Sequence, residues 1–502
     1  MLIWLIIVPV IAAALIGLAK APGRLTALAS ATFTLIMGLW AVISTTFCDC
    51  CCATSSCWST FAGHDLQFTL DLPLSRIMLL LSVLVTFGAI LGLKAPNKDA
   101  ERSWSISALL LSTGAIGAFL SDNIISFYAF HELALIPTFV MIGYYGRGDR
   151  RTIAWTATVY LGLASMILLV GLLMLCNQMG AWSFSAMKAA VAAGMVPTGC
   201  LASGLLLLGF GTLVSLFPFH SWAAPAYASA PTPIAMLHAG VLKKFGLYGL
   251  FTLAWIFGEH AASFFGCWNN VLLVLLLGNV LWVGYVTIAQ TRLDDMLGNS
   301  SVMHMGYIFL AFAAYVAMGG NNELAIKGAA LLMLAHGLTI AMLFLLNGQI
   351  ERQTRTLEMD SMGGLANKVP GLGFFFCLAG LASIGLPLLA NFAGEFTVFV
   401  SCFQGWSPGC AAVDGGLLGT IAGWFGGLGA VQLATVFALW GLVISAIYML
   451  RAIRHIFEGE TGIAAERATG LSRTDVLSAV FLAFFIVLFG ICPFLALNGI
   501  IL

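Results

Sequence analysis

The chain has 502 residues, of which 61% are hydrophobic and only 8% are charged, and its 21 basic and 21 acidic residues give a formal net charge of zero. Soluble domains carry about 25% charged residues, so this composition excludes a water-soluble protein of this size and predicts a protein embedded in lipid. The balanced charge, with neither a basic nor an acidic tail, predicts no binding to nucleic acid.

A helix needs about 20 apolar residues to cross the hydrocarbon core of a bilayer. The apolar segments predict an all-α, multi-pass membrane protein with about fourteen such helices. The first segment has no basic leader, so we expect it to remain as a helix and not to be cleaved as a secretory signal. In chain order the predicted spans are 2–19, 25–46, 73–93, 104–120, 122–142, 152–176, 201–219, 231–257, 266–289, 297–318, 326–349, 370–403, 420–450 and 474–497.

Broken helices are predicted at two places, near residues 218 and 387. The segment 370–403 is too long for one straight span, and Pro387 within it removes a helical hydrogen bond. Pro218 has the same effect in an earlier span and is followed by a run of further prolines. Paired interrupted helices are typical of transporters that are built from internal structural repeats.

Basic residues gather in alternate loops. Lys and Arg in short loops favour the cytoplasmic side of a membrane. The even-numbered loops carry little beyond Lys188 and, at a helix edge, Lys327, so the pattern predicts an even number of spans and both termini on the non-cytoplasmic side. The basic residues of the odd-numbered loops are Lys20, Arg24, Lys94, Lys98, Arg102, Arg147, Arg150, Arg151, Arg292, Arg352, Arg355, Lys368, Arg451, Arg454, Arg467 and Arg473.

Five of the twelve cysteines crowd into one loop that is predicted to face outward. They are Cys48, Cys50, Cys51, Cys52 and Cys57. An oxidising compartment on that side would let disulfides persist. The run has no paired CxxC spacing and His64 is the only nearby histidine, so a disulfide or a loop without a special role is favoured over a metal site.

A few ionisable side chains lie within predicted spans, where each costs several kcal/mol unless it is paired or hydrated. They are Glu132, His238, Lys243, Lys244, His304, His336 and Glu395. Lysine in a desolvated site can load and release a proton, and imidazole passes protons through its two nitrogens. Lys243 and Lys244, as neighbours on a helix, point about 100° apart and cannot share one partner.

The alternative for each of these groups is a structural role. Glu132 could form a hydrogen bond between packed helices, Lys244 could be an ion-pair partner, and each histidine could bond across a helix interface. Ionisable groups on several different helices together predict a pathway for protons.

At these residues the chain resembles the antiporter-like subunits of respiratory complex I, and it is most similar to the M-type. The resemblance runs from about residue 75 to 450. The matching segments are FHELALIP at 130–137, FPFHSW at 217–222, APTP at 230–233, GVLKK at 240–244, SVMHMG at 301–306, AHGL at 335–338 and NFAGEF at 391–396.

The resemblance implies two inverted repeats of five helices, each with a broken helix, around a hydrated axis of charged residues. The implied parts of the chain are residues 1–103 with helices 1–3, residues 104–257 with the first repeat, residues 258–452 with the second, and residues 453–502 with a loop and helix 14. The implied proton path consists of Glu132, Lys244, His304, His336 and Glu395. Further candidates are His131, His220, His238 and Lys243.

The resemblance also implies a function. The chain would translocate protons in the bacterial inner membrane as a subunit of an NADH:quinone oxidoreductase, beside L-, N- and K-type membrane subunits. It would bind no cofactor itself, and NAD, FMN, iron–sulfur clusters and quinone would belong to its partners. The alternatives are a subunit of an Mrp-type cation/proton antiporter, a relative in a membrane-bound hydrogenase, formate-linked or inorganic-carbon uptake complex, and a membrane scaffold that no longer conducts.

One position departs from the family pattern. The family usually has a lysine in the seventh helix, seven residues before the histidine that matches His220, and this chain has Leu213 there. In the family that lysine pairs with the acid that matches Glu132. His131 stands where the family usually has tryptophan, so we consider it a substitute partner for Glu132. Either the entry of protons is modified, or the first half no longer pumps.

Overall fold

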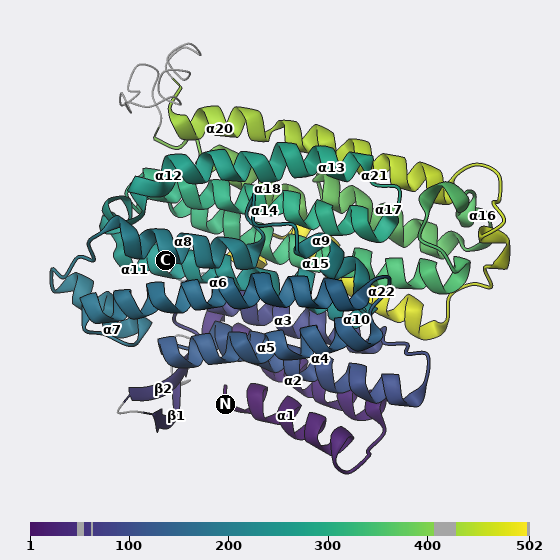
Figure 1. Ribbon diagram of the computed structural model, residues 1–502, viewed down its shortest axis with the longest axis horizontal. Coiled ribbons are helices and arrows are strands. Elements are labelled where there is room, and N and C mark those ends of the chain that lie inside the picture. Colours follow the sequence, from purple (N-terminus) through teal and green to yellow (C-terminus); the bar gives the residue numbers. More distant parts are fainter. Residues whose placement is uncertain (48–54, 62–63, 406–427, 499–502) are drawn as a thin grey trace.

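The computed structural model describes residues 1–47, 55–61, 64–405 and 428–498, and within these the protein is a bundle of long helices that run roughly side by side (Figure 1). Large apolar side chains such as Trp40, Trp155, Met166 and Phe484 are exposed on outer helices. Such exposure suits a protein whose outer surface meets lipid. The prediction of a multi-pass, all-α membrane protein is therefore confirmed.

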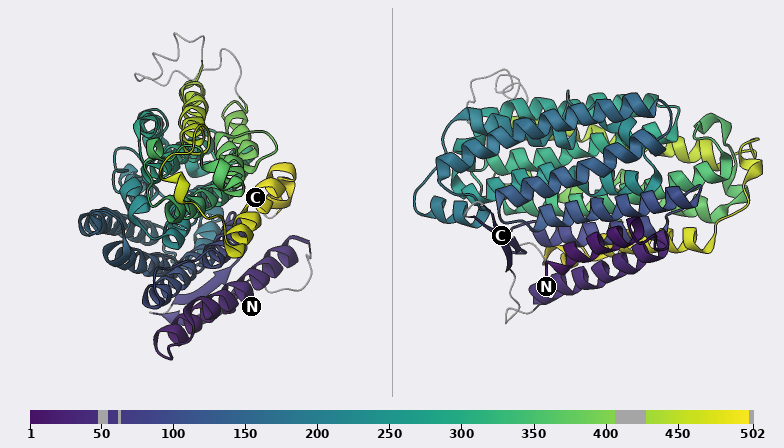
Figure 2. Two further views of the ribbon diagram at one scale, coloured as in Figure 1. Left: turned by 90° about the vertical axis from the view of Figure 1, so that its right-hand side faces the viewer. Right: turned by 60° about the horizontal axis from the view of Figure 1, so that its bottom comes forward.

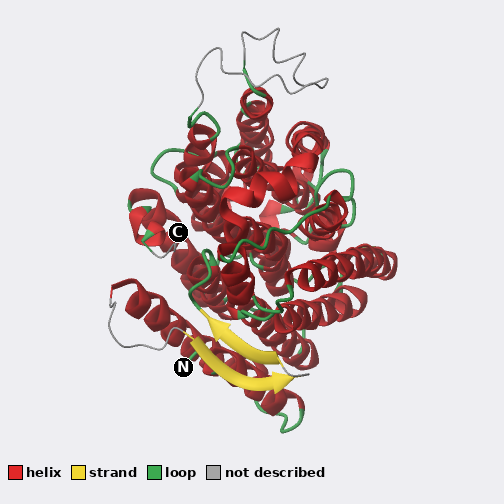
Figure 3. Ribbon diagram, turned by 90° about the vertical axis from the view of Figure 1, so that its left-hand side faces the viewer, coloured by secondary structure: helices red, strands yellow, loops and turns green. Residues whose placement is uncertain are grey.

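The first helices form one edge of the bundle, and a small hairpin caps them at one end. The helices are α1 (Trp4–Gly17), α2 (Gly23–Phe47) and α3 (Ser75–Leu91). Between α2 and α3 lie the antiparallel strands β1 (Ser55–Phe61) and β2 (His64–Thr69), which Figure 3 shows at that end. The sequence analysis did not predict this hairpin. Cys57 lies in β1, whereas the other four cysteines of the predicted outward loop lie outside the described residues.

The first predicted repeat runs from α4 to α11. Its elements are α4 (Lys98–Leu120), α5 (Ile124–Tyr145), α6 (Arg150–Met179), the short α7 (Phe184–Ala192), α8 (Cys200–Val214), α9 (Ala223–Ser229), α10 (Thr232–Gly240), the 3-10 turn η1 (Leu242–Lys244) and α11 (Phe245–Phe257). The amphipathic α7 was not predicted, and the Nζ atom of its Lys188 lies 3.4 Å above the ring centre of Trp255.

The second predicted repeat runs from α12 to α21, after the turn η2 (Gly258–His260). Its elements are α12 (Ala261–Leu277), the π-helical turn η3 (Gly278–Val283), α13 (Gly284–Ala289), α14 (Leu293–Ala317), α15 (Glu323–Thr354), η4 (Met359–Ser361), α16 (Leu365–Lys368), α17 (Pro370–Ile384), α18 (Ala390–Ser401), α20 (Ala430–Ala438) and α21 (Trp440–Phe457). After η5 (Ala465–Arg467), the helices α22 (Arg473–Ile491) and α23 (Phe494–Leu497) return to the edge of α1–α3, as the left view of Figure 2 shows.

Both predicted broken helices are confirmed, and both end in the same way. After α8, Ser215 takes a left-handed conformation and the N–H of Leu216 bonds the carbonyl of Gly211 at 2.8 Å. After α17, Gly385 takes the same conformation and the N–H of Leu386 bonds the carbonyl of Leu381 at 3.1 Å. This is the Schellman arrangement, which closes the last turn of a helix. The fourth helix of each predicted repeat is thus interrupted by the same device.

The number of spans is less well defined than their position. Among the described residues, nine helical segments are long and apolar enough to cross a membrane, and four shorter apolar helices accompany them. One of the nine, Thr232–Ala289, covers 58 residues and contains α10 to α13, so it is long enough to cross a membrane more than once. The predicted total of about fourteen stays a prediction.

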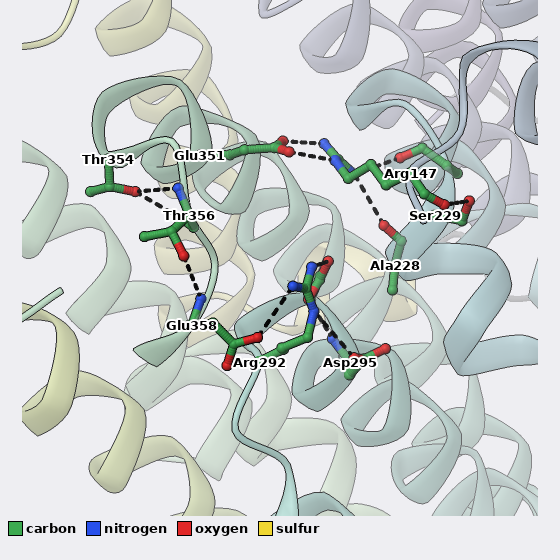
Figure 4. Close-up of polar contacts among 11 residues, drawn as sticks. Arg147, Ala228, Ser229, Arg292, Asp295, Glu351, Thr354, Thr356 and Glu358 are labelled. Atoms are coloured by element: carbon green, nitrogen blue, oxygen red, sulfur yellow. Dashed lines mark hydrogen bonds and ion pairs between the residues drawn. The ribbon is translucent and has the colours of Figure 1, made fainter. Parts of the chain in front are cut away.

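The basic loops lie at one end of the bundle, to the right in Figure 1, and α1 begins at the other end. Ion pairs join the elements at the basic end. Arg147 after α5 pairs with Glu351 on α15, as Figure 4 shows, and Asp475 on α22 pairs with Arg352 at 2.8 Å. These contacts fix α15, which is buried along its apolar length, at the centre of the molecule.

Candidate functional site

The two lysines lie where a long helix is interrupted. The predicted span 231–257 is not one helix, because the 3-10 turn η1 separates α10 from α11 and contains both Lys243 and Lys244. Their side chains are 1% and 0% exposed. The turn sends them to different partners, as predicted, since the Nζ of Lys243 lies 3.4 Å from the Oγ of Ser301 and that of Lys244 bonds the carbonyl of Ala239 at 2.7 Å.

Lys244 begins a buried line of titratable side chains that crosses to the second repeat. Its Nζ lies 3.1 Å from the Nδ1 of His336 on α15. The ring centre of His336 lies 5.4 Å from that of His304 on α14. The Nε2 of His304 lies 3.8 Å from the Oε1 of Glu395 on α18. The structure therefore brings together four of the predicted site residues in the order Lys244, His336, His304 and Glu395, and we call them the buried line.

His304 has acceptors at both of its ring nitrogens. Its Nδ1 lies 2.8 Å from the carbonyl of Ser300, and its Nε2 lies 2.9 Å from the carbonyl of Ser383 at the end of α17. Neutral imidazole has only one N–H, so only the protonated ring donates to both carbonyls. The break after α17 thus places the backbone carbonyl of Ser383 beside His304 and the carboxyl of Glu395.

The first break is supported by an amide that the sequence analysis missed. Asn279 lies in the π-helical turn η3 and is fully buried. Its side chain accepts from the N–H of Phe217 at 2.6 Å and donates to the carbonyls of Ser215 at 2.9 Å and Val302 at 3.1 Å. Irregular backbone at membrane depth needs such partners. The available signal was an amide in the middle of an apolar run, since Asn279 lies between Val271–Gly278 and Val280–Gly284.

His238 and His220 lie beside the buried line and not in it. His238 on α10 packs edge-on against Trp222, with ring centres 5.8 Å apart, and neither of its ring nitrogens has a hydrogen-bond partner among the described residues. His220 stacks on Phe217 within the first break. The hydroxyl of Tyr227 is also buried without a partner, and the Nζ of Lys243 lies 5.2 Å from the centre of its ring.

Glu132 lies apart from these groups, on the outer side of α5. Its side chain is 38% exposed and hydrogen-bonds to Ser165 on α6. The Nδ1 of His131 lies 3.6 Å from its Oε1, a distance that suits an ion pair when His131 is protonated and is too long for a hydrogen bond. The position of His131 therefore agrees with a partner for Glu132, although the role stays a hypothesis.

Aromatic rings adjoin His131 on its buried side. Its ring stacks on Phe245, the residue after Lys244, with ring centres 4.0 Å apart. Phe245 stacks in turn on Phe127 at 4.4 Å and packs near Phe210 at 6.0 Å. Leu213 is buried on α8 in the same apolar core. Where the family pattern has a lysine, this chain therefore has a buried leucine, and the rings of Phe245, Phe127 and Phe210 adjoin the buried side of His131.

Gly385, in the break after α17, lies beside the carboxylate of Glu395. A substitution at Gly385 therefore tests whether the position of Glu395 matters. The φ of Gly385 is +84°, and a methyl group there would collide with the carboxylate of Glu395. We expect Gly385→Ala to slow proton translocation by roughly 5-fold or more, because misplacing a reacting group is costly. The measurement is proton uptake by vesicles that contain the intact complex.

Gly180→Ala is the matched control for this substitution. Gly180 also follows a helix in a left-handed conformation, but nothing lies within 4 Å of an added methyl group there. Both variants share the backbone strain of about 1–2 kcal/mol. Equal slowing in both variants would mean that strain, and not the position of Glu395, limits the rate.

The fold and the buried line define a class of protein: a multi-pass membrane protein with two broken helices and a buried row of titratable side chains. Over residues 121–418 the chain matches the family described as NADH:quinone oxidoreductase/Mrp antiporter, TM. This match covers more than half of the chain, so the chain belongs to this family.

Relatives and solved structures agree with this membership. The chain is 32% identical over 447 residues to NAD(P)H-quinone oxidoreductase chain 4 1 of Synechococcus sp. (strain JA-3-3Ab), covering 88% of this chain and 78% of the relative. It is 28% identical over 445 residues to NADH-quinone oxidoreductase subunit M of Rickettsia prowazekii (strain Madrid E), covering 88% of this chain and 83% of that one.

Two solved structures share the fold. A chain of respiratory complex I from Thermus thermophilus superposes with a TM-score of 0.83 at 23% identity, covering 99% of this chain and 98% of that chain. A chain of the Mrp complex from Dietzia sp. DQ12-45-1b superposes with a TM-score of 0.78 at 18% identity, covering 99% of this chain and 96% of that chain. At such low identity these likenesses show the fold alone.

Proposed function

We propose that this chain is an M-type membrane subunit of a complex-I-like NADH:quinone oxidoreductase, and that it moves protons while partner subunits transfer electrons. The observation that carries the proposal is the buried line, because four titratable side chains from separate helical segments meet in sequence. Buried ionisable groups in a membrane are expensive, and a row of them is typical of proton relays.

The distances along the line suit a stepwise relay. The amine of Lys244 lies within hydrogen-bond distance of His336, so a proton passes directly between them. The rings of His336 and His304 are 5.4 Å apart, a gap that one water molecule or a ring rotation bridges. From His304 the proton reaches Glu395, 3.8 Å away, after a small movement of either side chain.

Buried polar atoms beside the line support a hydrated axis. Both nitrogens of His238, the hydroxyl of Tyr227 and the Oε1 of Glu395 are buried without a partner among the described residues. Buried water binds at such atoms, and each would otherwise cost about 1–3 kcal/mol. We infer that water at these positions connects Lys243 to the line.

We propose that Glu132 and His131 form a separate pair at the lateral face of this subunit. Glu132 is half-exposed on α5, and the aromatic layer of Phe127, Phe210 and Phe245 adjoins His131. With Leu213 in place of a lysine, no titratable side chain on α8 links this pair to Lys244. The main path then starts at Lys244 and runs through the second repeat to Glu395.

His131→Phe tests this division. We expect the substitution to change coupled proton translocation by about twofold or less, because phenylalanine keeps the stack on Phe245 and the pair lies off the main path. The measurement is proton translocation per electron in vesicles. A loss as large as that expected for Lys244→Ala would show that protons cross the aromatic layer through His131.

The remaining features of the proposal follow from the family. NAD, FMN, iron–sulfur clusters and quinone belong to partner subunits, and the membrane neighbours are L-, N- and K-type subunits. Residues 1–103, 104–257, 258–452 and 453–502 form the N-terminal helices, the two repeats and the C-terminal part. The membrane is the bacterial inner membrane, and the basic end of the bundle faces the cytoplasm, with both termini opposite.

An Mrp-type antiporter is the second candidate, since the family model covers both classes and a chain of an Mrp complex shares the fold. Purification of the complex under mild conditions separates the two. Co-purification with flavin- and iron–sulfur-containing subunits supports the proposal. Co-purification with antiporter subunits only, and sodium–proton exchange without electron transfer, contradicts it.

A further inference from the structure

A cavity of about 770 Å³ lies at the basic end of the bundle, away from the buried line. Its wall is formed by the start of α2, the connection between α3 and α4, the end of α5, the start of α10 and the end of α15. Pro96 and Arg355 on its rim are exposed. Five basic side chains line it: Arg24, Lys94, Arg147, Arg352 and Arg355.

Three of these cations are held in place by carboxylates on neighbouring helices. Arg147 pairs with Glu351 and donates to the carbonyls of Ala228 at 3.1 Å and Ala230 at 2.9 Å, as Figure 4 shows in part. Asp475 on α22 is shared, since Lys94 lies 2.5 Å from it and Arg352 lies 2.8 Å from it. The pairs make the wall rigid and leave the cations facing one space.

The charges of the cavity do not balance. Its carboxylates are Glu101 and Glu351 in the wall and Asp475 behind it, against five cations. The guanidinium of Arg24 donates to the carbonyl of Leu91 at 2.8 Å, and the side chain of Arg355 has no hydrogen bond or ion pair among the described residues. The cavity therefore has an excess of positive charge and one cation free to bind a ligand.

A neighbouring cluster at the same end shows the opposite balance. Arg292 alone faces Asp294 at 2.9 Å, Asp295 at 3.5 Å and Glu358 at 3.3 Å (Figure 4). The excess of cations in the cavity is thus not shared by this neighbouring cluster.

Two aromatic side chains indicate at which level of the bilayer the cavity lies. Trp104 and Tyr145 line it and meet edge to face with ring centres 6.5 Å apart. Trp and Tyr are enriched at the level of lipid headgroups. The indole N–H of Trp104 is buried without a partner, so it is a further donor in the wall. Basic pockets between helices at this depth bind the phosphates of anionic lipids.

We propose that this cavity binds a phosphate-bearing anion, with Arg355 as the contact that the protein leaves open for it. Arginine recognises phosphate through paired N–H donors. The phosphate belongs to the headgroup of an anionic phospholipid or to free phosphate, and the chemistry that recognises it is the same. This site is independent of the proposed movement of protons.

The test uses the intact purified complex, with Arg355→Gln as the variant and Arg151→Gln as its matched control. Arg151 is exposed at the same end and lies outside the cavity, and its side chain has no hydrogen bond or ion pair among the described residues. Neither substitution removes a contact from the fold. The probes are phosphatidylglycerol and a neutral glycolipid without phosphate, added after delipidation, and inorganic phosphate added without lipid.

We expect saturable binding that Arg355→Gln weakens roughly 5-fold and Arg151→Gln leaves unchanged. Binding of phosphatidylglycerol alone assigns the site to a lipid headgroup. Binding of inorganic phosphate alone assigns it to free phosphate, and competition between the two assigns it to both. The absence of saturable binding, equal binding of the neutral glycolipid, or equal weakening by both variants would overturn the proposal.

Discussion

Lys244→Ala is expected to lower proton translocation by the intact complex roughly 10-fold or more, with the complex still assembled. The amine of Lys244 is the group nearest to His336 at the start of the buried line, and Lys243 points to Ser301 and cannot replace it. Without the amine, a proton must cross an apolar gap to reach His336. The measurement is proton uptake by sealed vesicles, with electron transfer followed in parallel.

Two further variants separate loss of the amine from loss of packing. Lys244→Met keeps most of the side-chain volume without a titratable group, so we expect the same loss as for alanine. Lys327→Ala removes a lysine whose ion pair with Glu323, at 3.1 Å, is exposed at the start of α15, and it should leave translocation unchanged. Normal translocation in the methionine variant would remove Lys244 from the proposed path.

Glu395→Gln is expected to have the second largest effect. Glutamine has nearly the same shape but cannot ionise, so the line loses its last proton acceptor beside His304. We expect translocation to fall roughly 10-fold or more while the complex assembles normally. The measurement is proton uptake by the vesicles after a single turnover of electron transfer. It reports most directly whether the line still releases its proton at Glu395.

Glu323→Gln is the matched control for this carboxyl. Glu323 lies at the exposed start of α15 and pairs only with Lys327 among the described side chains. A loss in Glu395→Gln that also appears in Glu323→Gln would be an effect of charge on the complex as a whole. Full translocation in Glu395→Gln would place the end of the path elsewhere.

Apolar length and proline position predicted most of the fold. Spans such as 297–318 and 326–349 coincide closely with α14 and α15, because lipid requires long uninterrupted apolar helices. The breaks near 218 and 387 were predictable because proline and glycine act locally. The β1–β2 hairpin and α7 were not predicted, since short segments outside the membrane lack a strong periodic signal.

The residues of the buried line were among the candidates from the sequence, but the contacts between them were not predicted. The sequence indicated that Lys243 and Lys244 point apart, but the 3-10 turn that decides which of them meets His336 has no local signature in Val241-Leu242-Lys243-Lys244. The pair of carbonyls around His304 could not be predicted from the sequence either, because Ser383 belongs to a helix that is distant in sequence and reaches His304 only in the folded protein.

The structure gives a physical context for the replacement of the family's lysine by Leu213. In the sequence it was only a missing lysine beside Glu132. The structure shows that Leu213 is buried and that Phe245 stacks on both His131 and Phe127, on the buried side of His131. The apolar surroundings suit leucine, so the loss of the lysine and the packing around it are consistent with each other.

The central claim is that Lys244 and Glu395 belong to one path, and a double-mutant cycle tests it most directly. The measurement is the number of protons translocated per electron in vesicles with the intact complex, for wild type, Lys244→Ala, Glu395→Gln and the double variant. Groups in series on one path are not additive, so we predict that the double variant falls no further than either single variant. An unchanged ratio in both single variants, or losses that add in the double variant, would contradict a single path through the buried line.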